Sequence, residues 1–413
     1  MIYFDNAATG GKKPSCVVNI ALAAIKSANA NPGRSGHALS VTLATNLLKA
    51  RKVLSDFFGG YGYERVVFTK NCTEALNAAI FGFAQNAACG NARTGKTADE
   101  SACAAARNPA ETPRADAEKT GTKSVPHVLT TVMEHNSVLR PLRFLERTGR
   151  IRLTVLGLGE DGTVPPSAFA RAAREDTTAA VFTLASNVTG AAIDPAEVKK
   201  ALPDGVLVIC DGAQACGHMP VDMKAQGIDA LCVAGHKGMH GIAGSGALLF
   251  SARFSPAPLL YGGTGSESAN PDMPPFYPDR LEAGTLNYPA AMSMREGALY
   301  LKEHMQKSAD YVKGLTRILT DGLKKIAGIE LFSKPNPFGI VSFRAQSLQS
   351  EFFAQELSDY YDIAVRGGLH CAPLMHRALG SADGGLVRAS LSEFNTPHEA
   401  YAFLLAAEKI AKG

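Results

Sequence analysis

The sequence has no long hydrophobic run and no strong excess of charge of either sign. No apolar stretch approaches the roughly 18 residues that a helix needs to cross a bilayer. The first residues, Met1 to Asn6, contain neither the basic nor the apolar segment of a secretory signal peptide. The net charge of +4 over 413 residues is spread along the chain, and no basic stripe carries interleaved aromatic residues. We therefore expect a protein that binds neither a membrane nor nucleic acid.

Paired cysteine motifs are absent too. The eight cysteines form no Cys-x-x-Cys pair, and several lie inside apolar runs. This pattern argues against a zinc site or a disulfide framework and predicts reduced thiols in a cytoplasmic protein. The chain also lacks a P-loop, and it lacks a G-x-G-x-x-G after its first strand. His236 and His240 have the spacing of a zinc pair, but they flank a glycine turn without an H-E-x-x-H context.

The sequence does contain a regular alternation of strand and helix patterns. Short apolar runs predict seven strands at 66–68, 128–132, 150–156, 179–184, 206–209, 228–233 and 246–250. Amphipathic patterns predict helices at 15–27, 39–58, about 72–83, 165–174 and 195–202. Strands that alternate with helices imply right-handed crossovers and a mostly parallel sheet. The predicted fold class is therefore α/β.

A concentration of proline and glycine between Pro256 and Pro289 marks a candidate domain boundary. Beyond it we expect a long helix or bent pair at 290–326, helices at 348–361 and 397–411, and strands at 329–332, 339–343, 363–365 and 386–391. We predict a large domain of residues 15–265 and a smaller α+β domain of residues 1–14 and 266–413. Residues 86–124 have almost no large apolar side chains and are predicted to be an insertion without a catalytic role.

Polar side chains follow four of the predicted strands. They are His135, Asn187, Asp211 and Lys237. Ligands of parallel sheets bind beyond the carboxyl ends of the strands, so these residues are expected to converge on one site. Lys237 follows an apolar strand within Ala-Gly-His-Lys-Gly. Desolvation at such a place lowers the pKa of the amine and suits Schiff-base chemistry, although most loop lysines are simply solvated charges.

A phosphate site is the second candidate feature. The segment from Thr69 to Glu74 joins a strand to a helix, and the helix start at Thr73 offers free N–H groups and a favourable dipole. An ordinary N-cap without a ligand explains the same residues. A phosphate at Thr73, an aldehyde at Lys237, a ring nitrogen at Asp211 and a flat ring under His135 together describe pyridoxal 5′-phosphate.

The second domain contributes a cysteine and two arginines. Cys371 lies in a glycine-rich loop near Arg366 and His370, where a thiolate is favoured over a buried, inert thiol. Arg388 is a lone charge in an apolar strand. It suits bidentate binding of a carboxylate, and an internal ion pair is the alternative.

Taken in order, these motifs resemble the cysteine desulfurases, which are fold-type I pyridoxal-phosphate enzymes of the class-V aminotransferase group. The matching segments are residues 3–9, 71–74, 133–135, 186–190, 211–214, 235–237, 282–285, 370–372 and 388–391. The resemblance covers nearly the whole chain outside 86–124, and the compact Cys371 loop is similar to that of the group typified by the SufS enzymes. It implies a large domain with a mostly parallel seven-stranded sheet and a smaller C-terminal α+β domain.

The resemblance also implies a role for each matching residue. Lys237 would be the Schiff-base lysine, Asp211 the partner of the ring nitrogen, Gln214 a donor to the ring oxygen, and His135 a ring-stacking proton shuttle. Thr73 and His236 would hold the phosphate, with Cys72 through its N–H and Thr285 from the second subunit of a homodimer. Arg388, Asn187 and Arg366 would bind the substrate, and Cys371 would carry a persulfide to an acceptor protein.

Two positions depart from the family pattern. Ala234 stands where the family usually has a phosphate-binding serine, and Cys72 stands where it usually has a threonine. A lost hydrogen bond to a charged group costs roughly 1.5–3 kcal/mol. The expected reaction converts L-cysteine to L-alanine. A selenocysteine lyase, an aminotransferase or kynureninase-like hydrolase of the same fold, and a catalytically silent binding partner are the alternatives.

Overall fold

The computed structural model describes residues 1–27, 29–88 and 125–412. Its main feature is a seven-stranded sheet, which confirms the prediction of a mostly parallel sheet. In spatial order the strands are β2 (Val66–Thr69), β8 (Gly246–Phe250), β7 (Ala230–Ala234), β6 (Leu207–Asp211), β5 (Thr177–Thr183), β3 (His127–Thr131) and β4 (Arg152–Leu156). Strand β8 runs opposite to the other six strands, which all point the same way.

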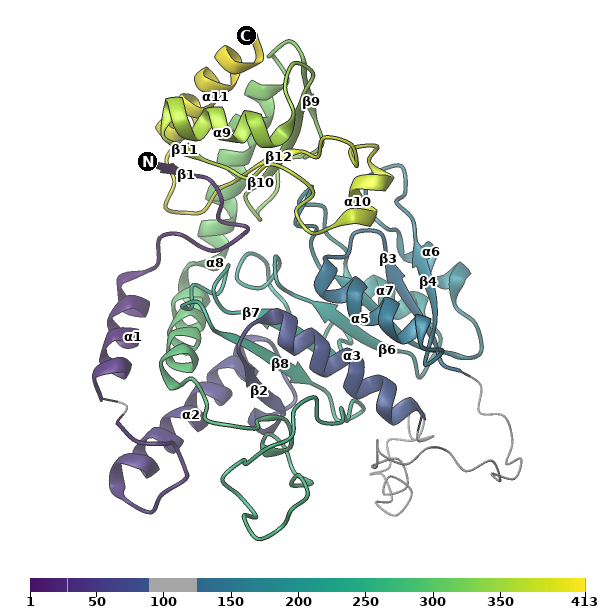
Figure 1. The fold of residues 1–413 in the computed structure, drawn as a ribbon, viewed down its shortest axis with the longest axis vertical. Helices are drawn as coiled ribbons and strands as arrows, with labels where there is room; N and C mark the ends of the chain where they lie inside the picture. The colour runs from purple at the N-terminus through teal and green to yellow at the C-terminus, as the bar shows by residue number, and fades with distance from the viewer. Residues whose placement is uncertain (28, 89–124, 413) are drawn as a thin grey trace.

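Helices cover both faces of this sheet (Figure 1). Buried side chains of α3 (Cys72–Ala88) and α5 (Asn136–Arg147) pack on one face. The other face packs against α2 (Ala38–Phe57), α6 (Pro166–Ala172), α7 (Pro195–Ala201) and the middle of α8 (Tyr288–Leu323). Because both faces are covered, the inner strands β5, β6 and β7 are almost wholly buried and rich in apolar residues.

A second body holds both chain termini (Figure 1). It contains a three-stranded antiparallel sheet of β9 (Ile329–Leu331), β10 (Ile340–Ala345) and β12 (Val387–Ser390). The N-terminal strand β1 (Ile2–Tyr3) pairs in parallel with β11 (Ile363–Ala364). The helices of this body are α9 (Ser350–Tyr361), α10 (Pro373–Ala378) and α11 (Pro397–Lys412). A reciprocal capping box starts α11, because Thr396 and Glu399 each accept the other's backbone N–H.

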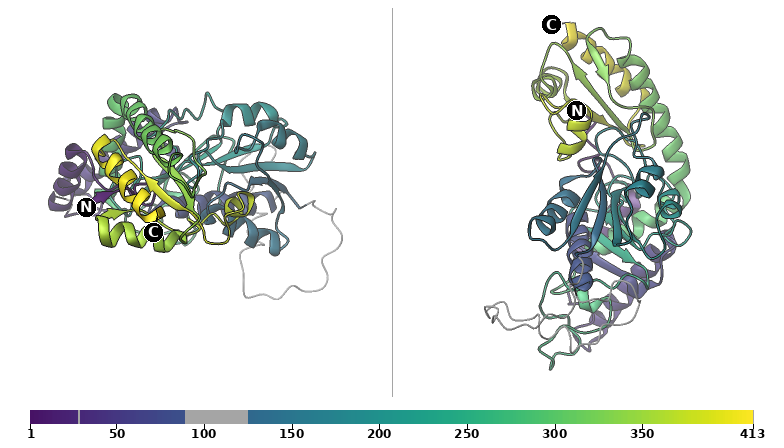
Figure 2. Two further views of the ribbon diagram at one scale, coloured as in Figure 1. Left: turned by 90° about the horizontal axis from the view of Figure 1, so that it is seen from above. Right: turned by 90° about the vertical axis from the view of Figure 1, so that its right-hand side faces the viewer.

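Helix α8 connects the two bodies along one edge of the molecule (Figure 2). Its first turns pack Ala291 and Met292 against α2 and α1 (Ser15–Ser27). Its last turns pack Leu315, Leu319 and Leu323 into the core of the smaller body. The division of the chain at residue 265 stays a prediction, since α8 contributes side chains to both cores.

Three sequence-based assignments need correction. No helix was predicted over α5, because Pro141 interrupts its helical pattern. Proline has no backbone N–H to donate within the helix, and the burial of Val138 and Leu142 compensates for this lost hydrogen bond. The short helix α10 was also not predicted. Helix α3 extends to Ala88 and not to Phe83, so the predicted insertion of residues 86–124 begins inside a helix, and its remainder lies outside the described residues. No helix in the described ranges is long and apolar enough to span a membrane.

Close packing of α8 on the turn after Lys237 gives a test of this arrangement. A Cβ atom built on Gly297 would lie 1.9 Å from the Met239 carbonyl oxygen, whereas one on Gly314 of the same helix meets nothing within 4 Å. We expect Gly297→Ala to lower the free energy of unfolding by about 1–3 kcal/mol through overpacking. The matched control Gly314→Ala should raise it by about 0.5–1 kcal/mol. Urea unfolding midpoints measure both, and equal stability of the two variants would contradict the close contact.

Candidate active site

A pocket lies at the carboxyl ends of the large-sheet strands, where the smaller body covers them. It brings together ten of the twelve predicted site residues, namely Cys72, Thr73, His135, Asn187, Asp211, Gln214, His236, Lys237, Arg366 and Arg388. Cys371 lies directly beside it on the Arg366 loop, and Thr285 lies elsewhere. Ala234, which departs from the family pattern, also lines the pocket.

The Lys237 amine and the Asp211 carboxylate form the centre of this pocket. Asp211 ends β6 and is 3% exposed, and Lys237 follows the neighbouring strand β7. Burial lowers the pKa of Lys237, and the negative charge of Asp211 opposes this shift. The Lys237 turn is compact because Gly238 has no side chain, since a Cβ there would lie 2.5 Å from the Cys216 carbonyl oxygen.

The Cys72 thiol points toward Asp211, which leaves the expected phosphate contact through the backbone N–H as a prediction. Its Sγ donates to Asp211 Oδ1 at 3.5 Å, and the same oxygen accepts the Ala213 N–H at 2.9 Å. Burial raises the pKa of the Cys72 thiol well above its usual value, and the nearby Asp211 raises it further. The thiol is therefore protonated at neutral pH and acts as a donor to the carboxylate. Only the backbone N–H of Cys72 is left to serve an anion at the start of α3.

His135 is held by the helix that it caps. Its Nδ1 accepts the Ser137 N–H at 3.1 Å at the start of α5, and the Ser137 hydroxyl also contacts Thr73 Oγ1 at 2.8 Å. Burial lowers the pKa of His135, so the ring is neutral near pH 7. Because Nδ1 accepts a hydrogen bond, the neutral ring carries its proton on Nε2. Ser137 was not predicted from the sequence, yet it joins the expected ring-stacking and phosphate-binding residues.

The N-terminal segment closes another side of the pocket. Gln214 Nε2 donates to the Ala7 carbonyl at 3.0 Å, and His236 Nδ1 lies 3.0 Å from Thr9 Oγ1. Burial, together with the positive charges of Lys237 and Lys13, lowers the pKa of His236 to about 4. His236 can therefore offer a phosphate a neutral hydrogen bond but no positive charge.

Arg388 combines the two interpretations that the sequence left open. The side chain is 1% exposed and lines the pocket, as expected for a carboxylate-binding residue. It is also internally paired: Nη2 lies 3.0 Å from Asp5 Oδ1, and Nη1 donates to the Asn187 carbonyl at 3.0 Å. Its Nε has no partner among the described residues. The guanidinium thus keeps N–H groups for a ligand while Asp5 balances its charge.

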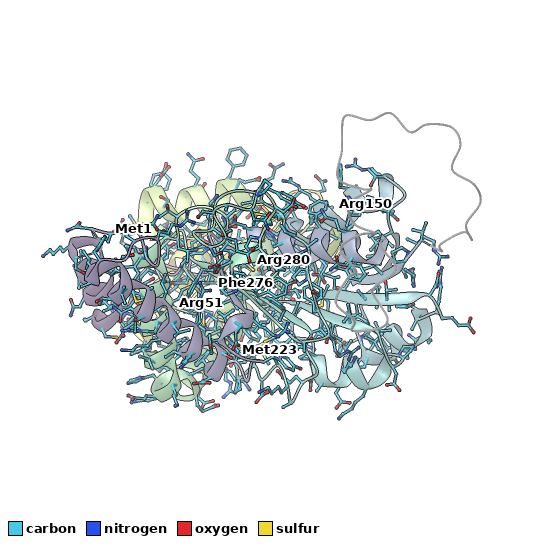
Figure 3. All side chains as sticks on the ribbon, turned by 90° about the horizontal axis from the view of Figure 1, so that it is seen from below. Met1, Arg51, Arg150, Met223, Phe276 and Arg280 are labelled. Atoms are coloured by element: carbon cyan, nitrogen blue, oxygen red, sulfur yellow. The ribbon has the colours of Figure 1, made fainter. Side chains whose placement is uncertain are left out.

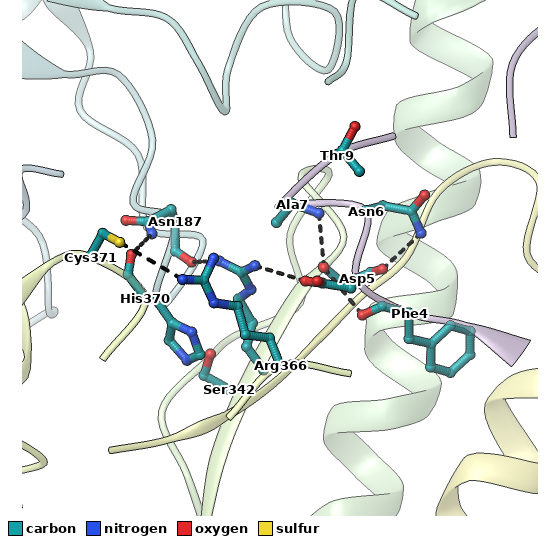
Figure 4. Close-up of polar contacts among 12 residues, drawn as sticks. Phe4, Asp5, Asn6, Ala7, Thr9, Asn187, Ser342, Arg366, His370 and Cys371 are labelled. Atoms are coloured by element: carbon teal, nitrogen blue, oxygen red, sulfur yellow. Dashed lines mark hydrogen bonds and ion pairs between the residues drawn. The ribbon is translucent and has the colours of Figure 1, made fainter. Parts of the chain in front are cut away.

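The Cys371 loop is fixed against the pocket by its backbone. Asn187 Nδ2 donates to the His370 carbonyl at 2.7 Å, and the Asn136 N–H donates to the Cys371 carbonyl at 2.7 Å. His370 and Cys371 both have positive φ angles, of 48° and 58°. Non-glycine residues hold this conformation only where their surroundings enforce it. Arg366 Nη2 lies 3.8 Å from the exposed Cys371 Sγ (Figure 4), so the loop presents the thiol next to a cation.

The remaining predicted residue, Thr285, does not reach this pocket. It is exposed in the segment between the 3-10 helix η2 (Asp279–Leu281) and α8, where its Oγ1 accepts from Asn31 Nδ2 at 3.3 Å. The sequence also gave no sign of Asp5 as the partner of Arg388. The two residues are separated by 383 positions, and no local pattern links them.

Glu134, just before His135, is a buried carboxyl group that the sequence did not single out. It is 0% exposed, and its Oε1 accepts from Thr131 Oγ1 at 2.5 Å and from the Thr183 N–H at 3.1 Å. Its Oε2 has no partner within the described residues. Burial raises the pKa of Glu134 from 4.5 to about 8. The folded protein therefore holds a proton here that the unfolded chain has lost by neutral pH.

This proton predicts a pH-dependent loss of stability. With the folded pKa above the unfolded one, the contribution of Glu134 is fully present below pH 4.5 and is lost as the pH rises toward 8. Glu134→Gln keeps the accepting Oε1 and has no proton to lose. Between pH 5 and 8, the wild type should lose up to about 1.4 kcal/mol per pH unit relative to the variant, as measured by urea unfolding. Parallel stability curves for the two proteins would show that Glu134 is ionised in the fold.

The chain resembles known proteins over nearly its whole length. The family model for aminotransferase class-V matches residues 2–111 and 114–403. A probable cysteine desulfurase from Methanothermobacter thermautotrophicus is 30% identical over 406 residues, which are 96% of this chain and 92% of that protein. A probable cysteine desulfurase from Aeropyrum pernix is 31% identical over 434 residues, covering 99% of this chain and 94% of that one.

Solved structures give the same match. The apo structure of a cysteine desulfurase from Thermococcus onnurineus NA1 superposes with a TM-score of 0.83 at 28% identity. The match covers 100% of this chain and 95% of that one. The likeness therefore extends over both the large sheet and the smaller body.

Proposed function

Since the chain belongs to the class-V aminotransferase family, we propose that it is a pyridoxal-phosphate-dependent cysteine desulfurase. The observation that carries this proposal is the position of Cys371. Its loop is bonded through two carbonyl groups to the pocket that contains Lys237, so an exposed thiol stands at the entrance to a buried amine. An aminotransferase has no use for a thiol at this place.

The residues of the pocket fit pyridoxal phosphate. At the start of α3, Asn71 Oδ1 caps the Glu74 N–H at 2.9 Å, and the N–H groups of Cys72 and Thr73 have no intrahelical acceptor and suit a phosphate. The Thr73 hydroxyl and the neutral His236 line the same pocket as further donors. The buried Asp211 suits a protonated ring nitrogen, Gln214 the ring oxygen, and His135 the ring face. Lys237 suits the aldehyde, because burial favours its uncharged amine. When bound, the cofactor would supply an electron-withdrawing ring that stabilises negative charge at the substrate α-carbon.

Arg388 would orient L-cysteine in the pocket. Its buried guanidinium keeps N–H groups for the substrate carboxylate, while Asp5 and the Asn187 carbonyl fix its plane. The Asn187 amide has a second hydrogen for the same carboxylate. Lys237, whose pKa burial lowers, would accept the α-proton, and His135 carries a proton on Nε2 that it can donate.

Cys371 would then take the sulfur atom. Its thiolate attacks the substrate sulfur, the S–S bond forms, and the carbon–sulfur bond breaks. The electron pair of the broken bond stays with the former β-carbon, which is protonated to give L-alanine. The enzyme retains a Cys371 persulfide, so one L-cysteine and one thiol yield one L-alanine and one persulfide. Arg366 Nη2, 3.8 Å from Sγ, places a cation beside the attacking sulfur atom.

A homodimer and a sulfur acceptor complete the proposal. Large apolar side chains are exposed on α1 and α2, among them Leu22, Ile25 and Val41. Such a face suits a partner subunit. Thr285 is exposed and does not line the pocket of its own chain, which supports a contact between its hydroxyl and the cofactor phosphate of a second subunit. The exposed Cys371 can hand its persulfide to an acceptor protein. Free thiols at all six cysteines in the described ranges support a reducing, cytoplasmic location.

The test of this function is the variant Cys371→Ala. It should keep the visible absorbance of bound pyridoxal phosphate, since Cys371 does not line the pocket. It should form no persulfide, and alanine release from L-cysteine should fall to background. Cys16→Ser is the matched control, because Cys16 is the other exposed cysteine among the described residues and starts α1, outside the pocket. It should behave as the wild type.

The alternatives give different results in the same assay. Alanine release from L-cysteine by Cys371→Ala at the wild-type rate would overturn the desulfurase proposal. Release from selenocysteine alone, with or without Cys371, would assign the protein as a selenocysteine lyase. Absence of bound cofactor in the wild type would indicate a catalytically silent protein.

A further inference from the structure

A buried ion pair lies outside the lining of the catalytic pocket. Arg51 of α2 and Glu282, just after η2, are 6% and 8% exposed. They are joined by two parallel hydrogen bonds, Nη1–Oε1 at 2.7 Å and Nη2–Oε2 at 2.6 Å. Oε1 also accepts the Phe68 N–H at 2.7 Å, which ties the pair to β2. Figure 3 looks onto this end of the molecule, with Arg51 labelled.

Stability alone does not explain such a pair. The desolvation cost of two buried charges offsets most of their attraction, and apolar residues of similar volume often do as well. What a bidentate pair provides is a fixed geometry, because both planar groups are locked in orientation. The segment that Glu282 starts, Glu282 to Thr285, is therefore the part of the chain whose position the pair determines.

Neighbouring contacts hold the same segment at every step. Arg34 Nη2 donates to the Gly284 carbonyl at 2.7 Å and to the Gly263 carbonyl at 2.9 Å. The Gly284 N–H donates back to Gly263 at 2.9 Å, and Asn31 holds Thr285 Oγ1. Despite this bonding, Gly284 and Thr285 are exposed. The structure thus holds an exposed threonine in a segment that is fixed by several hydrogen bonds.

We infer that Arg51 and Glu282 are positioning residues for the cofactor phosphate of the other subunit, acting through the Thr285 hydroxyl. This inference rests on the dimer and the cofactor proposed above. The loop of Asn31 and Arg34 joins α1 to α2, the helices with the exposed apolar face, so the supported hydroxyl lies beside the surface expected to meet the second subunit. Neither Arg51 nor Glu282 lines its own catalytic pocket.

The first measurement is cofactor affinity of Glu282→Gln. This change keeps the shape of the side chain but removes its charge and one acceptor for Arg51. The dissociation constant of pyridoxal phosphate should rise about ten- to a hundredfold, the loss expected for one hydrogen bond to a charged group. Glu330→Gln is the matched control, because Glu330 pairs with Arg344 on the exposed side of the smaller body. Its affinity should equal that of the wild type.

Dimers of two different subunits show whether Glu282 affects cofactor binding in the pocket of the other subunit or in the pocket of its own subunit. In the first dimer, one subunit carries Lys237→Ala and the other carries Glu282→Gln. The pocket with Lys237 then receives an intact Thr285 segment, and its cofactor absorbance should titrate with wild-type affinity. In the second dimer, one subunit carries both changes and the other none. The pocket with Lys237 now receives the altered segment and should show the full loss of affinity.

The reverse result, a loss of cofactor affinity in the first dimer and not in the second, would overturn the inference. It would assign the Arg51–Glu282 ion pair a structural role within its own subunit. Equal affinity in both dimers and in Glu282→Gln would overturn it as well. Should Glu282→Gln fail to fold, Arg51→Lys in the same arrangements keeps the charge and removes the bidentate geometry. A wild type without cofactor binding would instead refute the proposed function, which distinguishes the two failures.

Discussion

Burial of the Arg388 charge is the constraint on which the site depends. A guanidinium that is 1% exposed needs acceptors, and it obtains them from distant parts of the chain. Asp5 comes from the N-terminal segment, and the Asn187 carbonyl comes from the loop after β5. Backbone bonds of 3.1 and 2.8 Å join Arg388 to Arg366 on the Cys371 loop. The large body, the smaller body and the N-terminal segment are therefore all bonded to Arg388.

Asn187 extends this constraint to the loop of Cys371, the proposed nucleophile. Its carbonyl accepts from Arg388 while its amide donates to the His370 carbonyl, so Arg388 and the Cys371 loop share one bonding partner. The positive φ angles of His370 and Cys371 can persist because this bond and the bond from Asn136 hold the loop. Arg388 and the backbone of the Cys371 loop are therefore fixed relative to each other through Asn187.

The sequence predicted the parts of the site that follow strand ends. His135, Asn187, Asp211 and Lys237 were found because each ends a short apolar run, and parallel strands bring such ends together. It could not predict the Asp5–Arg388 pair, since pairing across 383 residues leaves no local pattern. Helix α5 was missed because a proline inside a segment argues against a helix in the sequence. In the folded protein the burial of its apolar side chains stabilises the helix despite Pro141. The direction of the Cys72 thiol depends on the room beside Asp211, which only the fold determines.

The end of the pocket that is proposed to bind the phosphate is lined by neutral donors. Ala234 offers no hydroxyl, the Cys72 thiol is engaged by Asp211, and His236, with a pKa near 4, is uncharged at neutral pH. The favourable potential then comes from the start of α3, whose dipole acts only over its first turn. Neutral hydrogen bonds depend on distance and angle more steeply than charges do. A site built this way gains more from a rigidly supported hydroxyl than a cationic site would, which gives a physical reason for fixing the Thr285 segment with a buried ion pair.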